Sequence, residues 1–221
     1  KPQKRLKKNL KLEKNLLIIA APTPSIKAFI LLFSGLVIAQ TADPFYGSVY
    51  FDNNSDYVFI TNTSSLNVQS NVTIEAWVRS ADDNGSIIYR QNNTQNFDPY
   101  FTIGIDDGCY HFSYRTDQNG LVELKQPDCT TDDTWHHIAA VIDDDSSFLY
   151  INGEQEVSME SPDGNLPEDF PMFLGVDGVF APLTNYFKGN LDEVRIWNRA
   201  LIAQEIQQLY NGVTYSYQWS P

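Results

Sequence analysis

Histidine is the first residue type to consider for chemistry, because it binds metals and transfers protons near neutral pH. His136 and His137 are neighbours in an alternating segment, so their side chains point to opposite sides and cannot bind one metal ion together. His111 stands apart from them, and the sequence contains no HxH or HExxH pattern. It also contains no GxSxG elbow and no glycine-rich phosphate loop. The histidines are therefore interpreted as structural, and esterase and nucleotide-binding activities have no support.

The chain has two cysteines, Cys109 and Cys129, which are too few for a structural zinc site with four ligands. A turn at 117–120 lies almost midway between them. If 110–116 and 121–125 form a hairpin around that turn, the cysteines come nearly opposite each other. We therefore predict a disulfide, which requires an oxidising compartment. Two buried thiols are the alternative.

Aromatic residues make up 13% of the chain, and several stand in or near polar loops. Sugar-binding modules stack sugar rings on exposed aromatic side chains and bind the hydroxyl groups with Asn, Asp and Gln. The candidate ligand-binding residues are Phe97, Tyr100, Tyr110 and Tyr186. Ordinary packing in the core or at its rim is the alternative for each of them.

The formal charge of −13 combines two opposite parts. The first 39 residues hold eight Lys or Arg and one Glu, whereas the remainder holds seven Lys or Arg and 27 Asp or Glu. The strongly acidic part after residue 39 argues against nucleic acid and anionic membrane surfaces as partners, because binding to either requires basic patches. It is compatible with divalent cations, and also with simple solubility.

An apolar run over 28–39 follows Lys27 and ends in Val37-Ile38-Ala39. The run is too short for a typical membrane span, and its small-x-small end is typical of signal peptidase sites. We predict a secretory signal peptide cleaved after Ala39, and a secreted or cell-surface protein with no membrane span in the mature chain. Residues 1–25 are either an unusually long basic n-region or an over-extended reading frame.

The remainder is organised as short alternating segments separated by turns rich in Asp, Asn and Gly, with no long helix or repeat. After a linker over 40–46, strands are expected at 47–51, 57–60, 72–80, 87–90, 100–105, 110–116, 121–125, 136–143, 147–151, 155–160, 172–176 and 191–197. In the last strand the alternation places Asp192, Val194 and Ile196 on one face. A short helix ending at Tyr210 follows. This pattern predicts an all-β sandwich.

Three ordered motifs carry a family resemblance. VTIEAWVR at 72–79, WHHIAAV at 135–141 with FLYING at 148–153, and GNLDEVRIWNRAL at 189–201 resemble the signature of laminin G-like domains. These domains belong to the concanavalin A-like superfamily. The resemblance implies a two-sheet antiparallel jelly roll with a short C-terminal helix over residues 47–212. Residues 213–221 would be a linker or the start of a following module.

The same resemblance implies a calcium site, since Asp192 matches the aspartate that begins the last strand in the wider group. Asp52, Asn54 and Asp56, in a polar turn, are expected to add oxygen ligands. The alternative is that Asp192 caps a turn at Gly189-Asn190.

Catalytic residues are not expected. The sequence lacks the E-x-D-x-E type of string found in glycoside hydrolases of this fold, and Glu154 and Glu156 alternate without an intervening Asp. Glu75 with Arg195, and Arg79 with Glu193, are expected as structural cross-strand ion pairs.

The expected function is therefore that of a non-catalytic secreted or cell-surface module that binds carbohydrate or an extracellular protein partner, with flanking modules in the same chain. The alternatives are a structural spacer without a ligand and, third, a glycoside hydrolase or lyase.

Overall fold

The computed structural model describes residues 48–61, 66, 68, 70–91, 99–118, 120–129, 131–166, 171–177 and 183–212. The predicted signal peptide, its cleavage after Ala39, the linker over 40–46, the candidate Phe97 and the tail over 213–221 lie outside the described residues.

The described segments form strands at nearly every place where the alternation predicts them. Their bounds are β1 Val49–Asp52, β2 Val58–Ile60, β3 Val72–Arg79, β4 Gly85–Gln91, β5 Pro99–Asp106, β6 Cys109–Arg115, β7 Leu121–Lys125, β8 Trp135–Ile142, β9 Ser146–Ile151, β10 Glu154–Glu160, β11 Met172–Leu174 and β12 Lys188–Trp197, followed by helix α1 Ala203–Tyr210.

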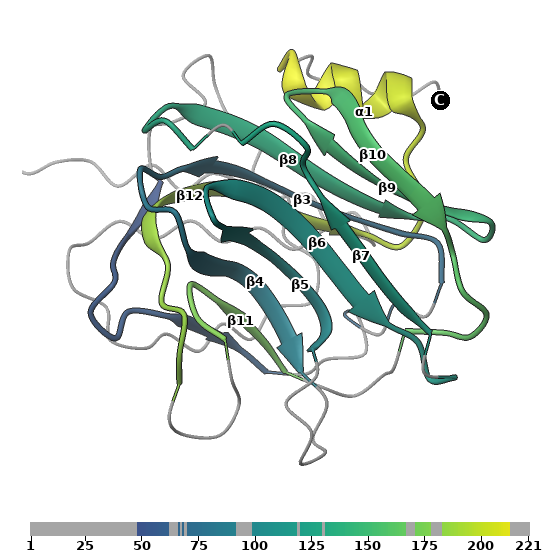
Figure 1. Ribbon diagram of the computed structural model, residues 1–221, viewed down its shortest axis with the longest axis horizontal. Coiled ribbons are helices and arrows are strands. Elements are labelled where there is room, and N and C mark those ends of the chain that lie inside the picture. The colour runs from purple at the N-terminus through teal and green to yellow at the C-terminus, as the bar shows by residue number, and fades with distance from the viewer. Residues whose placement is uncertain are drawn as a thin grey trace, which may run out of the picture.

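The strands form two antiparallel sheets that pack face to face (Figure 1). Sheet I has the order β1-β12-β3-β8-β9-β10, and sheet II has the order β2-β11-β4-β5-β6-β7. Neighbours in the sheets are often distant in sequence, as in the pairing of β3 with both β12 and β8. The predicted jelly-roll sandwich is thereby confirmed.

The hydrophobic core lies between the two sheets because one face of each strand is apolar. In β3, Val72, Ile74 and Val78 are fully buried against the inner face of sheet II. Tyr110, Phe112 and Tyr114 of β6 face them from the other layer. Burying a side chain of this size stabilises the fold by about 1.5–3 kcal/mol relative to leaving it in water.

A β-bulge interrupts the alternation in β12. Asp192 lies opposite Trp77 and Arg195 lies opposite Glu75, so three steps along β12 match two steps along β3. Glu193, in the bulge, has a φ of 49°. Asp192 therefore lies on the outer face of sheet I while Val194 and Ile196 lie in the core. The prediction that these three side chains share one face is wrong. It assumed strict period-two alternation, which does not reveal a bulge.

The predicted disulfide between Cys109 and Cys129 is present. Strands β6 and β7 pair with His111 opposite Lys125. The two Cα atoms lie 4.2 Å apart across a sequence separation of 20 residues. The turn at 117–120 thus brings the cysteines together as the hairpin register requires.

Helix α1 covers part of the outer face of sheet I (Figure 1). Ile206 and Leu201 are buried there against Ala139, Val141 and Tyr150. Ile202 is the N-cap residue of α1, and its side chain has no atom that could accept a hydrogen bond from the first turn. The Glu205 carboxylate instead accepts a hydrogen bond from the Ile202 N–H, at 3.1 Å. In the described part of the chain no helix is long and apolar enough to cross a membrane.

Gly189 is a glycine that the start of β12 requires. Sequence patterning places it in a turn, but it lies inside β12 with a φ of 146°. A Cβ atom at this position would lie against the Arg79 carbonyl oxygen and 2.8 Å from the Phe187 ring.

We expect Gly189→Ala to lower the free energy of unfolding by about 3 kcal/mol, because neither the backbone angle nor the space suits a side chain. Gly212→Ala is the matched control, since Gly212 also has a positive φ, 69°, but a Cβ atom there would meet nothing within 4 Å. Chemical denaturation measures both. Equal losses in the two variants would contradict the close approach of β12 to β3.

Candidate functional site

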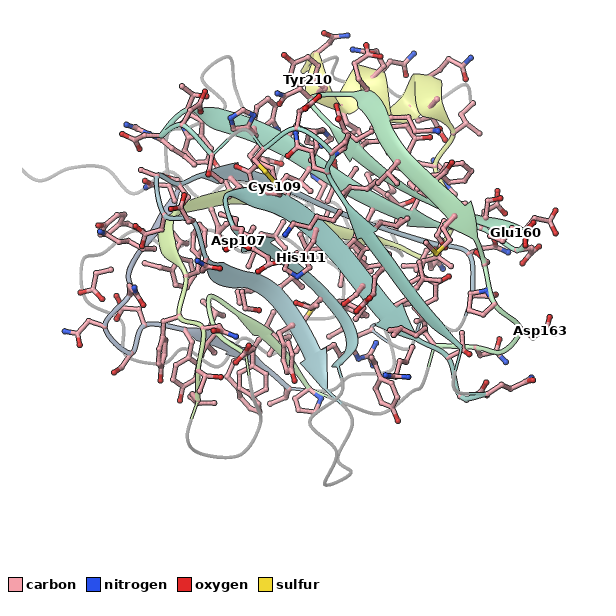
Figure 2. All side chains as sticks on the ribbon, in the orientation of Figure 1. Asp107, Cys109, His111, Glu160, Asp163 and Tyr210 are labelled. Atoms are coloured by element: carbon pink, nitrogen blue, oxygen red, sulfur yellow. A yellow bond between two sulfur atoms is a disulfide. The ribbon has the colours of Figure 1, made fainter. Side chains whose placement is uncertain are left out.

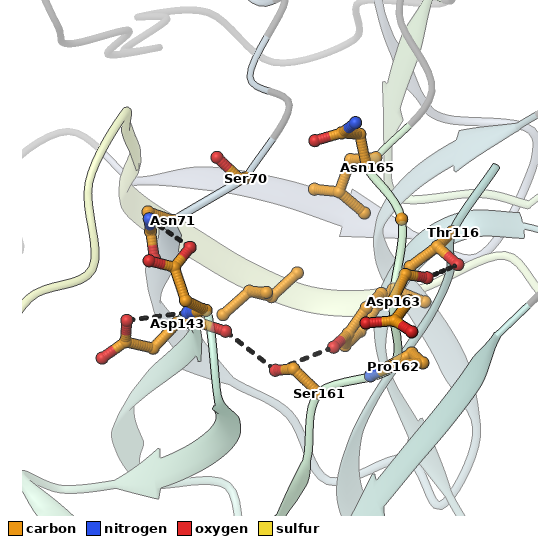
Figure 3. A pocket seen from close by; sticks show the side chains of 13 residues that line it. Ser70, Asn71, Thr116, Asp143, Ser161, Pro162, Asp163 and Asn165 are labelled. Atoms are coloured by element: carbon orange, nitrogen blue, oxygen red, sulfur yellow. Dashed lines mark hydrogen bonds between the residues drawn. The ribbon is translucent and has the colours of Figure 1, made fainter. Parts of the chain in front are cut away.

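A polar pocket of about 270 Å³ opens at one end of the sandwich. It lies between the loop that joins β8 to β9 and the loop that joins β10 to β11, with the start of β3 and the end of β6 beside them (Figure 3). Hydrogen-bonding side chains dominate its wall. The lining residues are Ser70, Asn71, Tyr114, Thr116, Ile142, Asp143, Asp144, Ser161, Pro162, Asp163, Gly164, Asn165 and Leu166.

The loop over 161–166 is fixed in place by hydrogen bonds to the end of β6. The Thr116 hydroxyl donates to the Asp163 carbonyl oxygen at 2.8 Å. The Asn165 N–H donates to the Asp117 carboxylate, and the Asp117 N–H donates to the Asn165 carbonyl oxygen, both at 2.9 Å. These contacts join segments almost fifty residues apart, so one wall of the pocket is preformed.

A chain of hydroxyl groups forms the pocket floor. The Tyr114 hydroxyl lies 2.7 Å from the buried Ser147 hydroxyl, which lies 2.9 Å from that of Ser161. The Ser161 hydroxyl donates in turn to the Asp143 carbonyl oxygen at 2.9 Å. Because each member is hydrogen-bonded, the floor is rigid and its polar atoms are satisfied.

Asn71 contributes a side chain whose hydrogen bonding is incomplete. Its Nδ2 donates to Asp144 Oδ1 at 2.7 Å, and this contact orients the amide. Its Oδ1 is buried and accepts no hydrogen bond from the described residues. A buried acceptor without a donor is uncommon in folded proteins. Because this oxygen is closed to solvent, a group bound in the pocket would reach it only after the Asn71 side chain turned.

The pocket is acidic. Asp143, Asp144 and Asp163 line it, and none of the described residues that line it is Lys, Arg or His. None of the ion pairs recorded for the described residues involves these three carboxylates. Across the described ranges, no group of three or more His, Cys, Asp or Glu side chains converges in a way that could hold a metal ion.

Two of the predicted calcium ligands, Asp52 and Asp192, are not brought together. Asp52 lies opposite Lys188, four residues before Asp192 along β12, which separates the two by about 13 Å at strand spacing. One Ca²⁺ with ligands about 2.3–2.6 Å away cannot bind both side chains. Asp52 and Asp56 instead accept N–H groups within their own turn, from Asn54 and Asp52 respectively. The four-residue ligand set is therefore corrected.

The predicted aromatic residues are scattered. Tyr110 is fully buried and packs 5.7 Å from the His136 ring, so its candidacy as a sugar platform is wrong. Burial raises the pKa of its hydroxyl above the ordinary value. Tyr100 is half-buried on β5. Tyr186 is half-buried in an aromatic cluster on the outer side of sheet II. That cluster comprises Tyr57, Phe59, Tyr89, Phe173, Val176, Leu183 and Tyr186.

The pocket residues were missed by sequence reasoning, which interpreted their segments only as strand ends, turns and loops. Two segments are dense in side chains that hydrogen-bond hydroxyl groups: DDDS at 143–146 and SPDGN at 161–165. That density is a signal for a site only once two such loops are known to lie at the same end of the sandwich.

A second polar cluster lies on the outer face of sheet I, where it is closed to solvent. Glu75 and His137 are both buried, with 0% of each residue exposed. His137 Nε2 donates to Glu75 Oε2 at 2.8 Å, and Trp197 Nε1 donates to Glu75 Oε1 at 2.9 Å. Arg195 Nη1 lies 3.3 Å from the same Oε1. The predicted Glu75–Arg195 pair is therefore present.

The predicted partner of Arg79 is wrong. Arg79 binds Asp133, with 3.1 Å between its Nε and Asp133 Oδ1, and Glu193 pairs with Arg195. The register explains this, since Arg79 lies opposite Asn190, three residues before Glu193 along β12. His136 and His137 lie on opposite faces of β8, as the alternation predicts, and His136 hydrogen-bonds to Asp132 at 3.0 Å.

Aromatic rings cover the Glu75 cluster on the side that faces α1. The Tyr210 ring stacks on Trp77 with centroids 5.8 Å apart, and it lies 6.4 Å from the His137 ring. Tyr210 comes from the last turn of α1 (Figure 2). The cluster is therefore an anchor for the helix, and it offers no open surface to a substrate.

Glu75 makes the stability of the fold dependent on pH. Burial by itself would raise the pKa of Glu75, but the hydrogen bond from His137, the positive charge of Arg195 and the Trp197 bond together hold that pKa below its ordinary value. Because the folded-state pKa lies below the unfolded-state value of 4.5, the stabilisation is complete above that pH. It is lost as the pH falls through the folded-state pKa.

We expect Glu75→Gln to lower the free energy of unfolding at neutral pH by about 3 kcal/mol, because it removes the carboxylate from a buried charge cluster. The variant should also lose less stability than the wild type on acidification below pH 4.5. Denaturant titrations across this pH range measure both effects. Asp106→Asn is the control, since Asp106 forms an exposed pair with Lys125 that contributes less than about 1 kcal/mol. Parallel pH profiles for Glu75→Gln and wild type would contradict the assignment.

Comparison with known proteins places this architecture in a family. The model of the concanavalin A-like lectin/glucanases superfamily, in its laminin G-like form, matches residues 52–207. The chain belongs to this superfamily. The match lies within the domain expected at 47–212. No curated protein matches the sequence.

Solved structures with the same fold include several binding domains. The binding domain of Paraclostridial Mosquitocidal Protein 1 is 17% identical, with a TM-score of 0.62 over 92% of this chain and 47% of that one. Mouse laminin alpha1 domains LG4-5 are 16% identical, with a TM-score of 0.58 over 76% of this chain and 46% of that one.

The ligand binding domain of botulinum neurotoxin serotype D, in complex with N-acetylneuraminic acid, is 14% identical, with a TM-score of 0.60 over 79% of this chain and 44% of that one. This chain therefore spans about half the length of these structures. At such low identity the similarity establishes the fold alone.

Proposed function

We propose that this chain is a non-catalytic module that binds a carbohydrate in the pocket at the end of the sandwich. The proposal depends chiefly on the pocket itself, a preformed polar cavity at the end of the sandwich. Carboxylates, an amide and hydroxyl groups surround it, and these are the groups that hydrogen-bond sugar hydroxyls. Pro162 and Leu166 add apolar surface for the face of a sugar ring.

Size and rigidity support the same function. At about 270 Å³ the pocket lies just below the range of about 300–1,000 Å³ typical of small-molecule sites, which suits one or two sugar units. The hydrogen bonds of Thr116 and Asn165 hold the pocket open before binding. A preformed site loses little conformational entropy when the ligand arrives. The similar folds that serve as binding domains are consistent with this role.

The structural spacer is the second candidate, and one observation favours it. The centre of the outer face of sheet I is filled by the ion-paired Glu75 cluster and covered by α1, so that area has no room for a ligand. The enzyme is the weakest candidate. The buried Glu75 cannot reach a substrate, and Glu154 and Glu156 lie on the edge strand β10 with no acidic partner recorded beside them in the described chain.

We place the module outside the cell, as part of a larger adhesive or polysaccharide-handling protein. The Cys109–Cys129 disulfide supports an oxidising compartment. An extracellular protein is an alternative partner, and it would use the same loop-rich end of the sandwich.

A calcium ion at Asp192 stays a prediction, now without Asp52 as a ligand. The other ligands would include main-chain oxygens and water, which Ca²⁺ accepts. If Asp192 binds calcium, the melting temperature should be higher with calcium than with a chelator, since calcium at a hundred times its Kd stabilises by about 2.7 kcal/mol. The increase should be absent in Asp192→Asn. Equal melting temperatures for the wild type in both buffers would contradict a calcium site.

For the pocket itself we expect Asn71→Gly to weaken glycan binding about tenfold, as loss of one or two hydrogen bonds would. Asn71 has a φ of 34°, which glycine tolerates, so the melting temperature should change little. A glycan array on the full chain selects the ligand, and calorimetry then compares the variants.

Asn53→Gly is the matched control, because Asn53 also has a positive φ, 63°, and lies in an exposed turn away from the pocket. Absence of binding to any glycan would overturn the proposed function. Unchanged affinity in Asn71→Gly would place the site elsewhere.

A further inference from the structure

We infer that the pocket selects sugars that carry a protonated amine, such as glucosamine oligosaccharides, over neutral sugars and sugar acids. This inference rests on the proposed carbohydrate site and names the class of its ligand. It starts from the imbalance of charge in the wall, where Asp143, Asp144 and Asp163 are present and the other described lining residues are uncharged.

The carboxylates are spread around the space rather than gathered at a point. Figure 3 shows Asn71 and Asp143 on one side of the pocket and Thr116, Asp163 and Asn165 on the other, with Ser161 between them. This agrees with the finding that no three acidic or histidine side chains of the described chain could hold a metal ion. A cationic ligand for this pocket would therefore meet single carboxylates at several points, which suits a body larger than a metal ion with its charge on one part.

The carboxylates keep free acceptor capacity. Asp144 accepts one hydrogen bond from Asn71, at 2.7 Å, and Asp143 accepts one from the Asp144 N–H, at 2.7 Å. A carboxylate has about four lone-pair sites, so each can accept more. An ammonium group is a donor only, with three N–H groups, and its hydrogen bonds to carboxylates are charge-assisted.

The neutral groups of the pocket suit the rest of such a ligand. The amide of Asn71 lines one wall, and the amide of Asn165 lies on the opposite wall. Ring hydroxyl groups both donate and accept, so they match amides and hydroxyls. A sugar carboxylate would instead approach three negative charges with no compensating cation, and like charges at short distance repel. N-acetylneuraminic acid, which the botulinum serotype D domain binds, should therefore bind weakly here.

Calorimetric titration of the full chain tests the inference with three matched trisaccharides: glucosamine, N-acetylglucosamine and galacturonic acid. The pH should lie below the pKa of the sugar amine and above the ordinary aspartate pKa of about 3.9. We expect the glucosamine trisaccharide to bind at least about tenfold more tightly than the acetylated one, and the sugar acid to bind most weakly. High salt should reduce the preference, because it screens charge interactions.

Asp163→Asn tests the assignment of charge to this pocket. It should reduce the preference for the amine severalfold while binding of the acetylated trisaccharide stays the same. Asp107→Asn is the matched control, since Asp107 is exposed and lies at the other end of the molecule (Figure 2). Asp107→Asn should change neither the preference for the amine nor the affinity for the acetylated trisaccharide. This separates an effect of charge in the pocket from an effect of the overall negative charge.

The outcomes separate the two proposals. Equal binding of all three sugars, or tightest binding of the sugar acid, would overturn the selectivity and leave the carbohydrate site in place. An amine preference that Asp107→Asn reduces as much as Asp163→Asn would also overturn it, because the charge responsible would not be in the pocket. No binding of any sugar would overturn the proposed function itself.

Discussion

A carboxylate without access to water lies at the centre of sheet I, and the closing strand and helix depend on it. Glu75 receives hydrogen bonds from His137 of β8 and Trp197 of β12, with Arg195 beside it. A buried charge is costly unless it is paired and hydrogen-bonded, so removing any donor leaves a large penalty. The three central strands of the sheet must therefore keep one register. The same cluster supports the stacked Tyr210 and with it α1.

That use of the sheet face limits where a ligand can bind. The interior between the sheets is filled by the core, and the middle of the outer face of sheet I is occupied by the Glu75 cluster and α1. Loops at the ends of the sandwich remain, and loops held by a rigid scaffold are where binding sites concentrate. The pocket beside Asn71 and Asp163 lies at such an end, and hydrogen bonds to β6 and β8 make it part of the scaffold.

Features with a local signal could be predicted from the sequence. Period-two alternation located the strands, and the turn after β6 located the Cys109–Cys129 disulfide. The Glu75–Arg195 pair followed because both residues lie on the same face of neighbouring strands. Features that depend on distant contacts could not be predicted. The bulge at Glu193 moves Asp192 to the outer face, and the burial of Tyr110 depends on the opposite sheet. The pocket joins Asn71 to Asp144, 73 residues away.

The most direct test of the account is a map of backbone amide shifts by nuclear magnetic resonance, with the full chain titrated with a glucosamine oligosaccharide. The account predicts that the largest shifts fall on Asn71, Asp144, Asp163 and Asn165, with the Glu75 cluster unaffected. Shifts concentrated on the aromatic cluster around Tyr57, Phe59 and Tyr186, with those four residues unchanged, would contradict it. The ligand would then bind the outer face of sheet II, and the end pocket would be only a product of loop packing.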